Sequence, residues 1–367
     1  MIDSLQTGGS ERQFVALSHS LDRTRFRVSL GCMQRIGPLL EGLKVDQFPL
    51  GGNLYGFRSW KTRMDIGRHM RRHSMLVAQA FDFYSNLTLV PAARLAKIPV
   101  VIGSQRQLGD LLTPAQSQAQ TMIFRWCDAV VCNSQAAAQR LIDSGLSEKK
   151  TRVIWNGIAP ETFVSTPPAL VPRPGWLRVG MIARMNSRAK NHSLFLRAAA
   201  RLEALTRQVE FVLVGDGPLR PELEREASSL GLGERVHFLG DRRDIPAVLA
   251  SLDLTALSSD SESLSNAVIE SMAAGVPVVA TSVGSNPELL AEDRGMLVPP
   301  RDEDSLAAAL GKLLENDGMR ARMGQNCRNF AEENLTLEKM RSYHEQLYME
   351  LLARKGRRGP LAQPTSG

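Results

Sequence analysis

The sequence predicts an α/β protein built from two doubly wound domains, each with a parallel sheet covered by helices. The chain has 367 residues, which is more than one ordinary domain contains. Short apolar runs alternate with helical patterns along most of its length, as is typical of parallel sheets with crossover helices. A segment rich in proline and threonine, 164–174, lies between two such halves and is expected to link the two domains.

The composition is that of an ordinary globular protein, with 43% hydrophobic and 23% charged residues. No apolar run is long enough to span a bilayer, and no signal peptide opens the chain. A net charge of +7 favours an anionic partner, such as a nucleotide sugar, an anionic lipid surface or nucleic acid. The cysteines show no pairing or metal-ligand spacing, so we expect reduced, buried thiols in a cytoplasmic protein at Cys32, Cys127, Cys132 and Cys327.

The densest basic stretch, 61–73, reads KTRMDIGRHMRRH and predicts a helix with a weak apolar side at Met64, Ile66 and Met70. One interpretation is a solvated helix face. The other is a surface that rests on anionic lipid headgroups, which would place the protein peripherally on the inner face of the plasma membrane. No aromatic residues are interleaved with the basic ones, so the stretch does not predict a nucleic-acid site.

The first half of the chain alternates strands and helices. Met1 to Leu5 predicts a first strand that is shorter than usual, as in a chain with a trimmed or late start. Gly8 and Gly9 follow it and permit a tight turn with close approach of the backbone to a ligand, before a helix over 11–21. Further strands are expected at 25–31, 45–50, 74–81, 99–103, 129–132 and 152–154.

Polar residues follow two of these strands, at the position where a doubly wound sheet binds its ligands. Asp82 comes after the strand at 74–81, and Arg106 comes after the strand at 99–103. We expect both side chains to contact a ligand. The alternative is that they only stabilise their own loops.

The second half begins with an apolar strand, and the loop behind it carries two long cations, Arg184 and Lys190. Cations on both sides of a strand-to-helix loop suit a pyrophosphate, with Arg188 as a weaker third candidate. The alternative is a basic surface loop. The next strand ends in Gly215, which suits another ligand-facing turn.

A further ligand loop follows an apolar run that ends at Leu257, and here Glu262 precedes a helix that begins near Ser265 and Asn266. The backbone N–H groups and the dipole at the start of that helix favour a phosphate. Carboxylates beside a phosphate site can accept hydrogen bonds from sugar hydroxyls, so we expect Glu270 to hold a ribose and Glu262 a second sugar. The alternative is that both are solvated surface glutamates.

The segment ESLSNAVIESMAAGVPVVATSVGSNPE, 262–288, resembles the E-x7-E signature of retaining glycosyltransferases of family GT4. The likeness extends over nearly the whole chain, with GG-x-E-R near the start, R-x5-K from Arg184 and VLVGDGPLRPELE in the second half. There are two departures from the family pattern. Ser263, Leu264, Ser265 and Asn266 replace the common Gly-Phe-Gly after the first glutamate, and no histidine stands in the loops of Asp82 and Arg106.

The resemblance implies a GT-B fold, in which two Rossmann-like domains face each other across a cleft and a C-terminal helix returns to the first domain. The implied limits are 1–166 for an acceptor-binding domain, 167–175 for the linker, 176–336 for a domain that binds the nucleotide sugar, and 337–353 for the returning helix. The basic residues after it, 354–367, are expected to be disordered.

The resemblance also implies how the site works. Arg184 and Lys190 would bind the donor diphosphate and stabilise the leaving group, while Glu262 would contact the donor sugar. Asp82 and Arg106 would contact the acceptor. The remaining donor-binding residues would be Gly9, Gly215, Ser265, Asn266 and Glu270.

The sequence therefore predicts a cytoplasmic hexosyltransferase. It would move a sugar from a nucleotide-diphosphate sugar to a hydroxyl of a glycan or lipid-linked acceptor, with retention of the anomeric configuration. The implied setting is bacterial cell-surface polysaccharide or glycolipid synthesis, and no metal or other cofactor is expected. Two alternatives stay open at this point, namely a GT-B sugar-nucleotide epimerase and a catalytically silent protein that binds nucleotide sugars.

Overall fold

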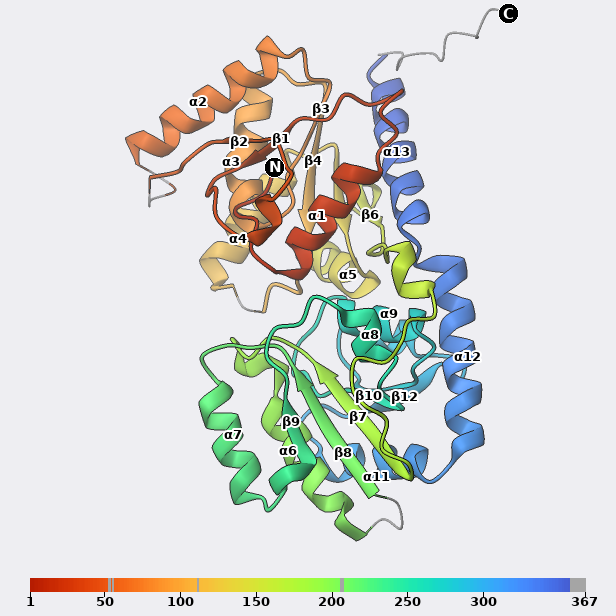
Figure 1. Ribbon diagram of the computed structural model, residues 1–367. Helices are drawn as coiled ribbons and strands as arrows, with labels where there is room; N and C mark the ends of the chain where they lie inside the picture. Colours follow the sequence, from red (N-terminus) through yellow and green to blue (C-terminus); the bar gives the residue numbers. More distant parts are fainter. Residues whose placement is uncertain (52–53, 55, 111, 205–207, 357–367) are drawn as a thin grey trace, which may run out of the picture. The chain divides into compact units, whose positions relative to one another are not determined.

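The computed structural model describes residues 1–51, 54, 56–110, 112–204 and 208–356, and it divides into two compact units (Figure 1). The first unit is Met1–Gly157 together with Leu337–Gly367, and the second is Ile158–Thr336. The chain therefore passes from the first unit to the second at Gly157, ahead of the linker predicted at 167–175. Most of the tail predicted to be disordered, 357–367, lies outside the described residues.

The first unit contains a parallel sheet with the strand order β3-β4-β5-β6 and a smaller parallel sheet of β1 and β2. Its strands are β1 Leu30–Cys32, β2 Val45–Gln47, β3 Val77–Gln79, β4 Val100–Gln105, β5 Ala129–Cys132 and β6 Thr151–Val153. Its helices are α1 Gly9–Ser20, α2 Phe57–Arg72, α3 Phe83–Leu95, α4 Pro114–Phe124, α5 Gln135–Asp143 and α13 Leu337–Arg354.

The first residues of the chain lie between these two sheets. Ile2 forms an isolated parallel bridge with Cys32 of β1, and its backbone N–H donates to Gly31 O at 3.0 Å. On the other side, the N–H of Phe81 donates to Met1 O at 3.0 Å. The strand predicted over Met1–Leu5 is thus reduced to a single bridge to β1, and the Phe81 hydrogen bond joins it to the segment that follows β3.

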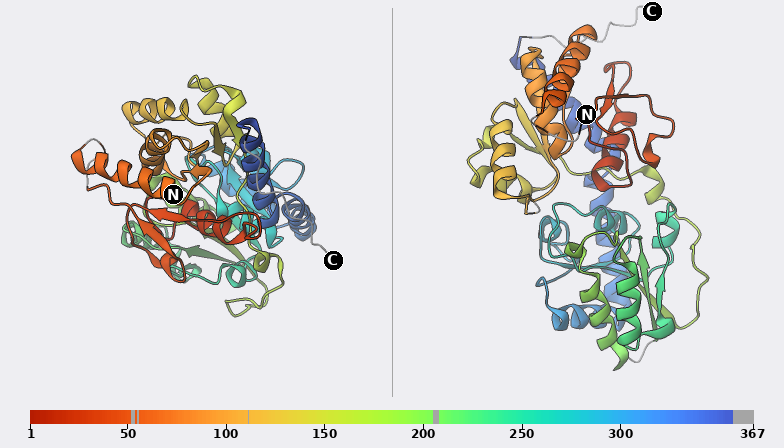
Figure 2. Two further views of the ribbon diagram at one scale, coloured as in Figure 1. Left: turned by 90° about the horizontal axis from the view of Figure 1, so that it is seen from above. Right: turned by 90° about the vertical axis from the view of Figure 1, so that its left-hand side faces the viewer.

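Helices cover both faces of the larger sheet in the first unit, as Figure 2 shows. Successive residues of β4 point to opposite faces, so that Val101 joins the core under α2, α3 and α4, while Val100 and Ile102 join the core under α1 and α13. This arrangement confirms the doubly wound architecture that the alternating pattern predicts.

Helix α13 belongs to the first unit although it comes from the far end of the chain. Leu347 and Leu351 pack in the same core as Phe14 and Leu17 of α1, and the hydroxyl of Tyr348 donates to Gln79 Oε1 at 2.5 Å. The predicted return of the C-terminal helix to the first domain is therefore confirmed.

Helix α2 contains most of the basic stretch and begins earlier than that stretch. Ile66, Gly67 and Met70 are buried, and Gly67 lies against Ala92 of α3 and Ala96, the C-cap residue of that helix. The weak apolar side predicted for this helix therefore packs inside the unit at Ile66 and Met70. Within the described residues, no helix combines the length and the apolar character needed to cross a membrane.

The second unit is built on one parallel sheet with the strand order β12-β11-β10-β7-β8-β9. Its strands are β7 Trp176–Ile182, β8 Gln208–Val214, β9 Val236–Phe238, β10 Leu254–Leu257, β11 Val278–Thr281 and β12 Gly295–Val298. Its helices are α6 His192–Ala200, α7 Arg220–Ser229, α8 Ile245–Leu249, α9 Asn266–Ala273, α10 Asn286–Leu289, α11 Glu303–Leu314 and α12 Asp317–Asn334. Phe211 and Leu213 of β8 face the core under α6, α7 and α11, whereas Val212 and Val214 face a separate core beside α8.

The segment predicted as a linker is fastened to the second unit. The N–H of Ala169 donates to Ala247 O at 2.8 Å, and the N–H of Leu170 donates to Ser251 Oγ at 3.0 Å. Arg178, which is buried, donates to Val171 O at 2.6 Å and pairs with Glu210. These hydrogen bonds hold the proline-rich segment against the second unit.

Candidate functional site

The loop after β7 presents the two predicted cations in different settings. Arg184 is exposed, and its side chain makes no hydrogen bond or ion pair with any residue that the structure describes. Lys190 closes a short 3-10 helix, Arg188–Lys190, and is half-buried. Asn191 follows in the left-handed conformation, with φ of 49°, and caps α6 by accepting from Leu194 N at 3.2 Å.

Glu262 lies in the loop after β10 and meets Lys190 in an ion pair. The carboxylate oxygen Oε1 accepts from Lys190 Nζ and also from Ser259 Oγ, the latter at 3.0 Å. The backbones of the two loops are joined as well, because Asp260 N donates to Ala189 O at 2.8 Å. The loops that follow the neighbouring strands β7 and β10 are therefore joined both by their backbones and by the ion pair of Lys190 and Glu262.

Helix α9 follows this loop and carries Glu270. Ser265 occupies the N-cap position without a capping side-chain bond, and Asn266 is the first helical residue. Glu262 is 9% exposed and Glu270 is 8% exposed, so neither is a solvated surface glutamate. A helix N-terminus, an ammonium group and two carboxylates on one sheet edge can bind an anion beside a polyhydroxylated group.

Gly215 brings a third loop against the Arg184 backbone. Its φ is 127°, and a Cβ atom placed there would lie 2.3 Å from Ala183 O and 3.2 Å from Arg184 Cα. The loop after β8 can therefore pack on the loop after β7 only with glycine at this position. The structure brings Gly215 together with Arg184, and Lys190 together with Glu262.

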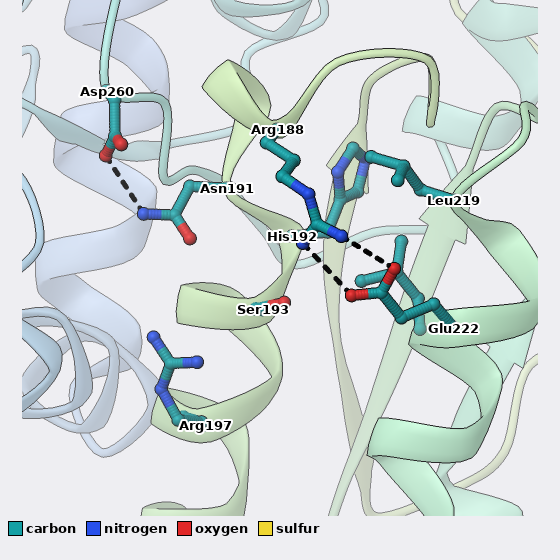
Figure 3. A pocket seen from close by; sticks show the side chains of 9 residues that line it. Arg188, Asn191, His192, Ser193, Arg197, Leu219, Glu222 and Asp260 are labelled. Carbon is teal, nitrogen blue, oxygen red and sulfur yellow. Dashed lines mark hydrogen bonds and ion pairs between the residues drawn. The ribbon is translucent and has the colours of Figure 1, made fainter.

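A pocket of about 320 Å³ lies beside the same loops, at the start of α6 and α7 (Figure 3). Arg188 forms a two-pronged ion pair with Glu222 there, at 3.0 and 2.9 Å, and Asn191 donates to Asp260 Oδ1 at 2.9 Å. Arg188 is thus engaged by a carboxylate. This engagement distinguishes it from Arg184 as a candidate to hold a diphosphate.

The remaining predicted residues belong to the first unit. Gly9 is the first residue of α1, and Gly8 is its N-cap. Asp82 is the N-cap of α3, where it accepts from Ser85 N at 2.8 Å and from Asp3 N at 2.6 Å. Burial raises the pKa of its carboxyl group to about 6, against the effect of these hydrogen bonds. Asp82 therefore has a structural role in its loop.

Arg106 follows β4 directly and is held from two sides. Its guanidinium lies 5.1 Å from the centre of the Phe81 ring and donates to Asn156 Oδ1. Burial lowers its pKa to about 10, and Glu11 in the first turn of α1 opposes this shift. Within the described residues Arg106 has no ion-pair partner, and its buried Nε–H has no hydrogen-bond acceptor.

The sequence does not predict three further residues that contact this site. Ser259 donates to Glu262, Thr281 donates to Ser259 O at 2.6 Å, and Gly284 lies against the backbone of Glu262. The signal that could have indicated Gly284 is the position of a glycine in the loop that follows an apolar strand. Ser259 and Thr281 carry no such signal, because only the pairing of β10 with β11 brings their loops together.

Neither unit shows, among its described residues, a cluster suited to a metal. In the part of the chain that the structure describes, no three side chains of histidine, cysteine, aspartate or glutamate are grouped closely enough to hold an ion. The four cysteines are all buried and unpaired, at Cys32, Cys127, Cys132 and Cys327.

Two models of protein families match this chain, one in each half. The model described as "Glycosyltransferase Family 4" matches residues 7–162, and the model described as "Glycosyl transferases group 1" matches residues 177–316. The first match covers most of the first unit and runs a short way past Gly157, and the second match lies wholly within the second unit.

Curated bacterial proteins with similar sequences carry names of the same kind. The lipopolysaccharide core biosynthesis glycosyltransferase LpsE of Rhizobium meliloti is 32% identical over 235 residues, which is 63% of this chain and 66% of that protein. The MMP alpha-(1->4)-mannosyltransferase of Mycolicibacterium hassiacum is 30% identical, over 62% of this chain and 55% of its own length. A UDP-Gal:alpha-D-GlcNAc-diphosphoundecaprenol alpha-1,3-galactosyltransferase of Escherichia coli is 24% identical, over 91% of this chain and 92% of its own. The chain thus matches less than two thirds of the length of the first two.

Solved structures share the fold over almost the whole chain. The Anabaena protein Alr3699/HepE in complex with UDP has a TM-score of 0.82 at 22% identity, and the match covers 95% of this chain and 98% of that one. Sucrose-phosphate synthase from Thermosynechococcus elongatus has a TM-score of 0.77 at 19% identity and covers 96% of each chain. These likenesses concern the fold.

Proposed function

Because the chain belongs to glycosyltransferase family 4 and has the GT-B fold, we propose that it transfers a sugar from a nucleotide-diphosphate sugar to an acceptor hydroxyl. The family and the fold class predicted from the E-x7-E signature and the alternating strands are thereby confirmed. The observation that carries the proposed activity is the joining of the Lys190 and Glu262 loops beside the helix that bears Glu270.

On the donor side, Lys190 and Arg184 would hold the diphosphate of the nucleotide sugar. Charge builds up on that diphosphate as the bond to the sugar breaks, and fixed cations stabilise it without reorganisation. Arg184 is suited to this because it has no partner among the described residues, and its guanidinium can bind two phosphate oxygens at once. The start of α9, at Ser265 and Asn266, would add its backbone dipole.

The two glutamates would divide the recognition of the donor. Glu270, in the second turn of α9, is placed to accept from the hydroxyls of a ribose, and Glu262 from those of the transferred sugar. Gly215 and Gly9 would let their loops approach the donor closely. We propose retention of the anomeric configuration, with the departing phosphate oxygen taking the proton of the acceptor hydroxyl.

The acceptor would bind in the first unit near Arg106 and Asp82. Arg106 is the better candidate of the two, because it is a cation without an ion-pair partner in the described chain, whereas Asp82 is engaged in its own loop. Relatives named for diphosphoundecaprenol acceptors and for lipopolysaccharide core synthesis support a glycan or lipid-linked acceptor, in bacterial cell-surface polysaccharide or glycolipid synthesis.

We propose that the protein works in the cytoplasm and makes peripheral contact with an anionic membrane. The four buried, unpaired thiols fit a reducing compartment. The first turn of α2 exposes Phe57 and Trp60, at 83% and 52%, and the same helix exposes basic residues along its length: Arg58, Lys61, Arg68, Arg71 and Arg72. Exposed aromatic rings with basic neighbours suit an interface with anionic headgroups.

The experiment that tests the proposed activity is a panel of nucleotide sugars with and without a membrane extract, with release of the nucleoside diphosphate as the readout. We expect release from one panel member that depends on the extract. Conversion to a new nucleotide sugar without any extract would indicate an epimerase, and binding without release would indicate a silent protein. The same assay with and without EDTA tests our proposal that no metal is needed.

A further inference from the structure

The segment 281–286, which runs from the last residue of β11 to the first residue of α10, lies directly against the loop that carries Glu262. Three contacts join the two. The hydroxyl of Thr281 donates to Ser259 O at 2.6 Å, the backbone of Gly284 abuts Glu262 O, and the N–H of Ser285 donates to Ser263 O at 3.0 Å. Asn286 closes the supporting loop on itself by donating from Nδ2 to Thr281 O at 2.9 Å.

Thr281 reaches the Glu262 carboxylate through one intermediate residue. Its side chain is fully buried, and its single hydroxyl proton is directed at Ser259 O, since the other acceptor in range, Leu257 O, is more distant at 3.4 Å. Ser259, fixed by this bond, then donates from Oγ to Glu262 Oε1 at 3.0 Å. The result is a chain of hydrogen bonds from Thr281 through Ser259 to Glu262, which Lys190 meets from the other side.

The backbone of Gly284 lies so close to the backbone of Glu262 that there is no room for a side chain between them. Its φ is +55°, which favours glycine, and a Cβ atom there would lie 1.7 Å from Glu262 O and 2.9 Å from Ser263 O. Contacts that short do not occur with backbone atoms, so any side chain at this position would displace the Glu262 backbone. Glycine is therefore required for the Glu262 loop to lie where it does.

We propose that Thr281 and Gly284 are positioning residues, which set the Glu262 carboxylate toward the donor sugar through the loops of β10 and β11. The inference rests on the proposed function and assigns these residues to the sugar end of the donor. The nucleotide end would depend on Glu270, which lies on α9 and not in the Glu262 loop that Thr281 and Gly284 contact. Substitutions of Thr281 or Gly284 should therefore lower the rate of sugar transfer and leave the affinity for the nucleotide unchanged.

The test uses Thr281→Val, which removes the hydroxyl and keeps the shape, and Thr281→Ser, which keeps the hydroxyl. Thr255→Val is the matched control, because Thr255 is also buried on this sheet and its hydroxyl bonds a backbone carbonyl, Pro277 O, at 3.3 Å. With the panel member that the wild-type protein consumes, we expect Thr281→Val to lose about tenfold in kcat/KM, as for one lost hydrogen bond. Thr281→Ser and Thr255→Val should stay close to wild type, and all three variants should bind the nucleoside diphosphate as the wild type does.

Gly284→Ala provides a second, independent variant. It should lose more activity than Thr281→Val while still binding the nucleoside diphosphate, which would also show that it folds. In a Glu262→Ala background, Thr281→Val should cause no further loss, because its effect passes through that carboxylate. The positioning role of Thr281 would be overturned if Thr281→Val and the wild type had equal kcat/KM. It would also be overturned if Thr281→Val caused the same loss in the Glu262→Ala background as in the wild type. Either result would leave the proposed function intact. A wild-type protein that neither binds nor consumes any nucleotide sugar would overturn the proposed function and this inference with it.

Discussion

Lys190 and Glu262 form an ion pair although 72 residues separate them in the chain. The pair exists because β7 and β10 are neighbours in the sheet, so the loops at their carboxyl ends meet. Each partner is a group that a nucleotide sugar would engage, since an ammonium suits a diphosphate and a carboxylate suits sugar hydroxyls. Donor binding would then share or replace the contact, and the two residues are expected to act as a unit.

The first prediction concerns this pair. Lys190→Ala and Glu262→Ala should each lower kcat/KM for transfer by roughly a hundredfold or more, because each removes a charge from the reacting end of the donor. The double variant should be only slightly worse than either single variant, since residues that act as a unit are not additive. A double-mutant cycle on kcat/KM measures this. Full additivity would mean that the ion pair has no part in catalysis.

The second prediction separates the two glutamates. Glu270→Ala should weaken binding of the free nucleoside diphosphate by about tenfold, because it removes the hydrogen bonds to the ribose hydroxyls. Glu262→Ala should leave that affinity nearly unchanged, because its partner is the transferred sugar. Calorimetric titration of both variants with the nucleoside diphosphate checks this, and the reverse order of effects would show that the two roles are exchanged.

The third prediction concerns acceptor binding at Arg106. Arg106→Gln should raise the KM for the acceptor roughly ten- to hundredfold, as expected for a lost charged hydrogen bond, while the KM for the donor stays the same. Arg106→Lys keeps the charge but loses the stacking on Phe81, so its effect should be intermediate. Rates measured against dilutions of the membrane extract give the acceptor dependence. If only the KM for the donor changed, Arg106 would contact the donor and not the acceptor, which would contradict this prediction.

The fourth prediction is a pH dependence of stability from His344. This ring is 1% exposed, and burial lowers its pKa to about 4 from the ordinary value of 6.5. Below about pH 6.5 the unfolded chain therefore binds a proton at His344 that the buried ring of the folded protein does not bind. The contribution of the neutral ring to the free energy of unfolding is fully present above pH 6.5 and is lost as the pH falls toward 4. The loss should reach roughly 3 kcal/mol over that range. Chemical unfolding of wild type and His344→Gln at pH 7.5 and pH 5 measures it, and an equal change in both proteins would contradict it.

The fifth prediction concerns the membrane surface of α2. Phe57→Ala combined with Trp60→Ala should reduce sedimentation with vesicles that contain phosphatidylglycerol, and high salt should reduce it further because basic residues contribute about 1 kcal/mol each. Trp126→Ala is the matched control, since Trp126 is a similarly exposed tryptophan of the same unit, at 54%, that lies outside α2. Equal losses for the two variants, or equal binding to neutral vesicles, would rule out this surface.

Sequence patterns predict the architecture well, because period and turn signals are local. The strand at 129–132 and the helix after Ser265 both lie where the sequence pattern places them. The E-x7-E spacing likewise places Glu262 in the loop after β10 and Glu270 in the second turn of α9.

Features that depend on tertiary contacts are not predictable in this way. The hydrogen bonds that hold the segment predicted as a linker, 167–175, are one example, because Arg178 lies later in the chain and donates to the carbonyls of Leu170 and Val171. The pairing of Lys190 with Glu262 and the support from Thr281 need the strand order of the sheet, which no local pattern contains. The aromatic residues Phe57 and Trp60 were missed because α2 begins before the basic stretch that marks it.

Transfer of a radiolabelled sugar from the nucleotide sugar to material in the membrane extract is the direct test of the proposed activity and its donor site. It should be measured with the wild-type protein and with Lys190→Ala, after thermal unfolding has shown that both proteins are folded. We expect extract-dependent incorporation by the wild type and a loss of roughly a hundredfold or more with Lys190→Ala. Equal incorporation by the two proteins would contradict the donor site described here, and no incorporation by the wild type with any nucleotide sugar would contradict the proposed transfer.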